Sequence, residues 1–92
     1  MADQGKKNIK GIALDIAEGY IFLTPLFLKP FNEELIKSLY TTLMRVQIEI
    51  RTEPFPYGEI SLIRRRNLRL QRVYAALIVL KNIARERKYK LL

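Results

Sequence analysis

Apolar residues recur at helical spacing in the middle of the 92-residue chain. Five of them follow one another at intervals of three and four residues, which places them on one helix face: Ile36, Leu39, Leu43, Val46 and Ile50. Asn32 is a favoured N-cap, and two acidic residues follow it at the positive end of the helix dipole. Alternation at 46, 48 and 50 also fits a strand, but the longer pattern favours a helix over about 32–52.

The last third of the chain repeats this spacing. We call such a line of residues on one helix face a seam. Here it consists of Ile63, Arg66, Leu70, Val73, Leu77, Leu80 and Ala84, and only Arg66 interrupts the apolar run. The absence of Gly and Pro from residues 59–89 predicts one continuous helix, roughly 45 Å long at a rise of ~1.5 Å per residue.

Two prolines and a glycine between these segments, in residues 52–59, exclude helix there. A short connection between two such helices predicts an antiparallel hairpin. With a turn near Pro56 the seams pair without adjustment, matching Ile50 with Ile63, Leu43 with Leu70 and Ile36 with Leu77.

The N-terminal segment predicts a weaker amphipathic helix over about 7–23, in which Gly19 is unfavourable. Residues 24–31 form an apolar connector that begins with a short turn, because Thr24 can cap it and Pro25 suits a first helical position. The predicted fold is therefore an all-α, three-helix arrangement in one domain, residues 1–92, with frayed termini at 1–6 and 90–92.

The tract 73–80 is apolar on every side, which is typical of a helix buried all round. A monomer of this size has little surface with which to cover it, so we expect a homo-oligomer. The predicted interface residues are Tyr74, Ile78, Val79 and Ile83. Alternatively, the apolar residues 20–28 fold over this face.

The net charge of +8 resides in the last third of the chain. Residues 1–59 hold seven Lys or Arg against eight acids, whereas residues 60–92 hold ten against one. Such asymmetry predicts an anionic partner, although a solvated charged face for solubility is the alternative.

Arginines dominate this excess. Arg65, Arg69 and Arg72 form a stripe that we expect roughly opposite the seam, with Arg87 further along it and Arg64 on a flank. Guanidinium groups form bidentate hydrogen bonds with phosphate oxygens. These five arginines are therefore the predicted nucleic-acid-binding residues. Some arginines are expected to pair internally instead, above all Arg66 with Glu49.

The chain has no His and no Cys, and it contains neither of the glycine-rich phosphate-binding motifs. We therefore predict no enzymatic activity, no cofactor and no metal site. The leading hypothesis is a basic helical module that binds DNA or RNA through its backbone. The alternatives are a helical adaptor that docks an acidic protein and, less favoured, a peripheral membrane protein using residues 20–28.

The longest apolar tract has nine residues, against roughly 20 for a membrane span, and no secretory signal is recognisable. The expectation is a cytoplasmic protein.

Overall fold

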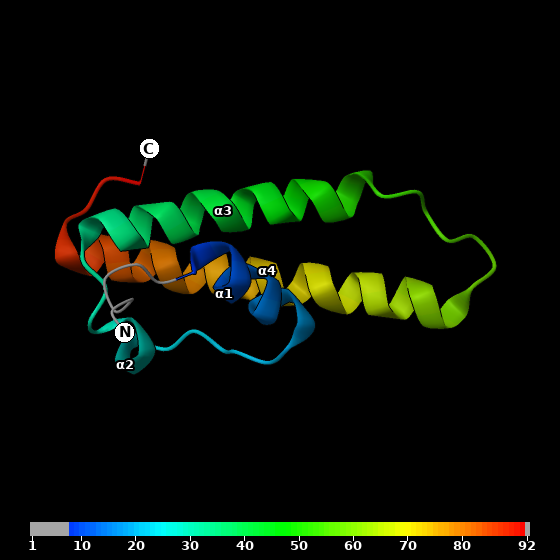
Figure 1. Cartoon of the computed structure of the whole chain (residues 1–92), viewed down its shortest axis with the longest axis horizontal. Coiled ribbons are helices and arrows are strands. Elements are labelled where there is room, and N and C mark those ends of the chain that lie inside the picture. The colour runs from blue at the N-terminus through cyan, green and yellow to red at the C-terminus, as the bar shows by residue number, and fades with distance from the viewer. Residues whose placement is uncertain (1–7, 92) are drawn as a thin grey trace.

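The computed structural model describes residues 8–91, and these form four helices without a strand. The helices are α1 (Ile9–Glu18), α2 (Pro25–Leu28), α3 (Glu33–Thr52) and α4 (Ile60–Arg87). Helices α3 and α4 run antiparallel as a long hairpin closed by the loop 53–59 (Figure 1). The predicted all-α fold and its dominant hairpin are confirmed.

Helix α4 is unbroken over 28 residues and sets the 44 Å long axis of the molecule. It ends where Lys88 adopts a left-handed conformation (φ 64°), and the N–H of Tyr89 bonds back to the carbonyl of Ala84. The tail then turns back toward the start of α3 (Figure 1), where Tyr89 and Leu91 pack against the core. Residues 1–6 and 92, predicted to be frayed, lie outside the described residues.

The N-terminal caps of α2 and α3 match the signals in the sequence. The side chain of Asn32 accepts a hydrogen bond from the N–H of Leu35 at 2.9 Å, so α3 begins as predicted. Thr24 accepts from the N–H of Phe27 at 3.1 Å, and Pro25 occupies the first turn of α2. The strand alternative for α3 is excluded, because residues 46–50 are helical.

Helix α1 is shorter than the predicted 7–23. It ends at Glu18, because Gly19 takes a left-handed conformation (φ 87°) and the N–H of Tyr20 bonds to the carbonyl of Asp15 at 2.8 Å. This is a glycine C-cap, which satisfies the last carbonyls of a helix and reverses the chain. Residue 7 lies outside the described residues, and α1 starts at Ile9 behind the cap Asn8.

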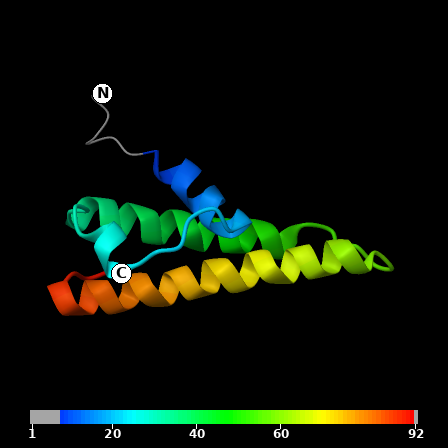
Figure 2. The same cartoon turned by 90° about the horizontal axis from the view of Figure 1, so that it is seen from below.

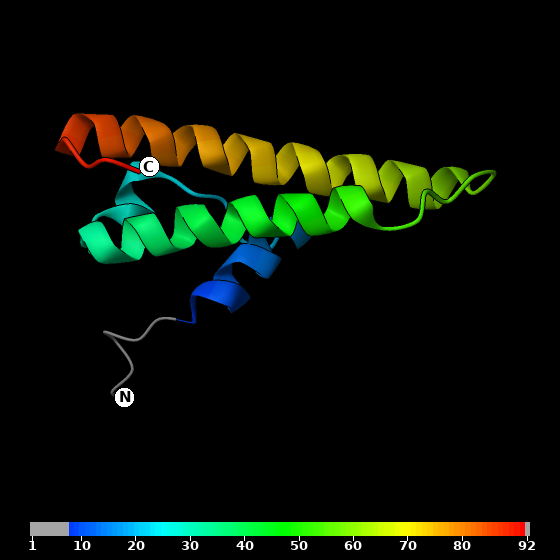
Figure 3. The same ribbon diagram turned by 90° about the horizontal axis from the view of Figure 1, so that it is seen from above.

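The core fills the space among three helices. α1 packs against both α3 and α4 and crosses the hairpin obliquely on one side (Figures 2 and 3). Residues with no exposed surface come from all three helices and the connector, and include Ala13, Leu28, Ile36, Leu43 and Leu80. Toward the 53–59 loop the hairpin extends past α1, so the end of the hairpin has only two helices (Figure 2).

Candidate nucleic-acid interface

The arginine stripe of α4 faces α1 instead of lying opposite the seam, so that part of the prediction is wrong. Nη2 of Arg65 donates to both carboxylate oxygens of Glu18, at 3.1 and 3.2 Å, and Nη1 of Arg72 donates to the carbonyl of Ala17 at 3.2 Å. Both acceptors lie at the C-terminal end of α1, where cations complement the helix dipole. The stripe thus helps to hold α1 on the hairpin.

Arg69 links three helices. Its Nη1 and Nη2 donate to the two carboxylate oxygens of Glu53 at 3.2 and 3.3 Å, and its Nε lies 3.7 Å from Oε2 of Glu18. Its side chain is 18% exposed, so most of the guanidinium is withdrawn from water. Internal pairing of some arginines was expected from the sequence, but neither Glu53 nor Glu18 was predicted as the partner of Arg69.

Arg87 is also engaged inside the protein. Its Nη1 donates to the carbonyl of Phe31 at 2.7 Å, and its Nη2 donates to the carbonyl of Leu28 at 3.0 Å. These bonds join the end of α4 to the connector between α2 and α3. Arg64, by contrast, is exposed, and its side chain makes no ion pair or hydrogen bond with any described residue.

The predicted pairing of Arg66 with Glu49 is wrong, because the structure shows no ion pair between them. The guanidinium carbon of Arg66 lies 5.3 Å from the ring centre of Phe55, which follows α3 in the loop. The ring of Phe55 in turn contacts the ring of Tyr57, and the two ring centroids lie 4.7 Å apart. The Nε of Arg66 is buried without a hydrogen-bond partner among the described residues.

The four predicted interface residues divide into two groups. Tyr74 is 60% exposed and Ile78 is 45% exposed, so both project from the surface of α4. Ile83 is only 5% exposed and belongs to the core, because it lies on the side of α4 that faces the rest of the domain; its place in an exposed interface is therefore corrected. Val79 is half-buried.

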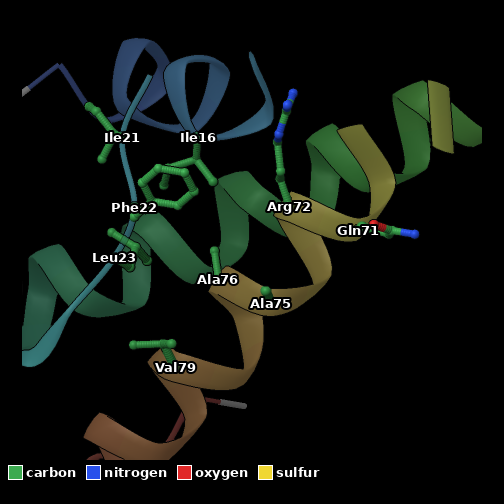
Figure 4. A pocket seen from close by; sticks show the side chains of 9 residues that line it. All are labelled: Ile16, Ile21, Phe22, Leu23, Gln71, Arg72, Ala75, Ala76 and Val79. Carbon is green, nitrogen blue, oxygen red and sulfur yellow. The ribbon is translucent and has the colours of Figure 1, made fainter. Parts of the chain in front are cut away.

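Val79 lines an apolar cavity of about 260 Å³ between α1, the segment 19–24 that joins α1 to α2, and α4. Figure 4 shows Phe22 and Leu23 of this segment facing Ala75, Ala76 and Val79 of α4. The small alanine side chains leave this space open, and Arg72 lies at one end of it. Segment 19–24 therefore covers one side of the apolar tract 73–80, as the alternative to self-association proposed, while Tyr74 and Ile78 remain uncovered.

Many cations have no internal partner. Among the described residues, nine have side chains that make no ion pair, hydrogen bond or ring contact: Lys10, Lys29, Arg45, Arg51, Arg64, Lys81, Arg85, Lys88 and Lys90. Only five carboxylates there are equally unpaired: Asp15, Glu34, Glu49, Glu59 and Glu86. The surface charge is therefore not neutralised by internal ion pairs.

Residues 8–91 contain no group of three acidic side chains placed to hold a metal ion. No helix in the same range is long and apolar enough to cross a membrane. The chain matches no family model, no curated protein and no solved structure.

Proposed function

We propose that this protein is a small basic helical module that binds nucleic acid through contacts with its phosphates. The observation that supports this most directly is a numerical excess of unpaired cations. Nine described cations have side chains without an internal partner, whereas only five described carboxylates are unpaired. Unpaired Lys and Arg at a surface release counterions from nucleic acid when they bind, which gives affinity with little dependence on sequence.

The contacts inside the protein rank the predicted binding residues. Arg64 is exposed and unpaired, and Arg65 keeps a side chain that is 58% exposed although it contacts Glu18. Arg69, Arg72 and Arg87 donate to internal acceptors and are partly withdrawn from water. Arg64 is thus the member of the predicted set best placed to contact a phosphate.

Replacing Arg64 tests the proposal. We expect binding of a labelled DNA duplex to weaken with rising salt, and Arg64→Gln to reduce the slope of log K against log salt by about 0.9 for one lost phosphate contact. Lys37→Gln is the matched control, because it removes the same charge from a residue already paired with Glu33 at 3.0 Å. Equal slopes for the two variants would exclude Arg64 as a contact. If neither DNA nor RNA, as a duplex or as a single strand, binds at low salt, the function is excluded.

Self-association is part of the proposal and rests on the exposed apolar side chains of α4. Tyr74 and Ile78 lie one helical turn apart and both project into solvent. The chain mass is 10.8 kDa, so light scattering should return a multiple of it. Tyr74→Ser with Ile78→Ser should return the monomer, whereas Phe22→Ser, at another exposed position, should not. A wild-type monomer at high concentration would contradict this interface.

The same apolar pair favours a second candidate function, an adaptor for an acidic protein. Lys81 and Arg85 follow Ile78 on α4 and have no internal partner, so an apolar contact would be flanked by positive charge. A monomer that binds no nucleic acid would favour this function over the first.

A further inference from the structure

Arg66 is a cation without an anion at the end of the hairpin. It is half-buried, its Nε is buried with no acceptor, and no described carboxylate lies within ion-pair distance of it. Its neighbours Arg65 and Arg69 are paired with Glu18 and Glu53 respectively. A guanidinium withdrawn from water gains from an anionic acceptor, so Arg66 is the unsatisfied member of this cluster.

These three arginines line one cleft of about 170 Å³, where the end of α3 meets the start of α4. Leu62, two loop prolines and Glu53, which is paired with Arg69, complete its walls. Arg65 is paired with Glu18, which lies outside the cleft, and Arg69 with Glu53 in the cleft wall, so the positive charge of Arg66 remains uncompensated. The volume is several times the ~30 Å³ that a water molecule occupies, enough space for a tetrahedral oxyanion.

Aromatic rings adjoin the cleft. Phe55 stacks under Arg66 at 5.3 Å and contacts Tyr57, whose side chain is 84% exposed. The loop extends past α1 (Figure 2), and the high exposure of Tyr57 leaves its ring open to a ligand. A cationic cleft next to an exposed ring is the arrangement with which proteins bind single strands, in which phosphates meet cations and unpaired bases stack.

We propose that the hairpin tip, residues 53–66, binds single-stranded nucleic acid, with a backbone phosphate in the cleft at Arg66 and an adjacent base stacked on Tyr57. This inference rests on the proposed function and assigns it a specific site. A duplex offers the phosphate but not the base, because its bases are already stacked on one another. The tip should therefore bind a single strand more tightly than a duplex of equal length.

The test measures fluorescence anisotropy with three labelled probes: a 12-nucleotide poly-uridine or poly-thymidine strand, the same strand with abasic sites, and a 12-base-pair duplex. Tyr57→Ala should weaken binding of the intact strand by about 5- to 150-fold, the range expected for one lost base stack. It should leave binding of the abasic strand unchanged. The matched control Tyr20→Ala removes another exposed tyrosine, just after α1, and should leave binding of all three probes unchanged.

Arg66→Gln should weaken binding of both single strands and lower their salt slope by about 0.7. Circular dichroism of each variant confirms that the helices are retained. If the wild type binds nucleic acid but Tyr57→Ala binds the intact strand equally well, the tip site is wrong while the proposed function stands. If the wild type binds none of the probes at low salt, both are wrong.

Discussion

Arg87→Met should lower the free energy of unfolding by about 2–3 kcal/mol. The guanidinium of Arg87 donates to the carbonyls of Phe31 and Leu28 at 2.7 and 3.0 Å, and both bonds join segments more than fifty residues apart in the chain. Hydrogen bonds to a charged group contribute about 1.5–3 kcal/mol each. Urea unfolding followed by circular dichroism measures the change.

Arg85→Met is the matched control for Arg87→Met. Arg85 lies in the same last turn of α4, so both variants lose the same favourable contact with the helix dipole. Arg85 is exposed and has no partner among the described residues, so its replacement should change stability by no more than about 0.5 kcal/mol. Equal urea midpoints for the two variants would show that the carbonyl contacts of Arg87 do not stabilise the fold.

Gly19→Ala should lower the free energy of unfolding by about 2–3 kcal/mol through two separate effects. Gly19 has φ 87°, and an L-residue in the left-handed region costs about 1–2 kcal/mol. An added Cβ would also lie 2.9 Å from the guanidinium carbon of Arg72, so this side chain would have to move and give up its bond to the carbonyl of Ala17. Thermal or urea unfolding gives the total.

Gly58→Ala separates the two effects. Gly58 has φ 80°, nearly that of Gly19, but nothing lies within 4 Å of the position where its Cβ would be. It should therefore show the backbone cost alone, ~1–2 kcal/mol. In an Arg72→Ala background, Gly19→Ala should also fall to this smaller value. If the cost of Gly19→Ala is unchanged in that background, the contact with Arg72 contributes nothing.

Together these variants separate the arginines that hold the domain together from those available to a ligand. Arg72 and Arg87 donate to backbone carbonyls and serve the fold, whereas Arg64 has no described partner. Arg66 lies between these groups, because it contacts a ring but no anion. The positive charge of α4 therefore serves both packing and, in our proposal, binding.

What the sequence determined by itself is local. The start of α3 at Asn32, the turn of α2 at Thr24 and Pro25, and the unbroken length of α4 follow from caps, prolines and spacing, all of which act within a few residues. The hairpin follows because two helices that each carry one apolar face, joined by a short loop, can bury those faces only by packing antiparallel against each other. The early end of α1 had a local signal in Gly19, but its left-handed conformation depends on the cap bonds that form around it.

Which arginine side chains are free depends on how the helices pack against one another. A helical wheel gives the direction of a side chain on its own helix, but it does not say where a third helix will pack. α1 lies along the side of α4 that carries Arg65 and Arg72, so Glu18 and the carbonyl of Ala17 reach them from 47 and 55 residues away. Contacts at such separation depend on how the helices fit together, and the spacing of residues within one helix carries no information about that fit.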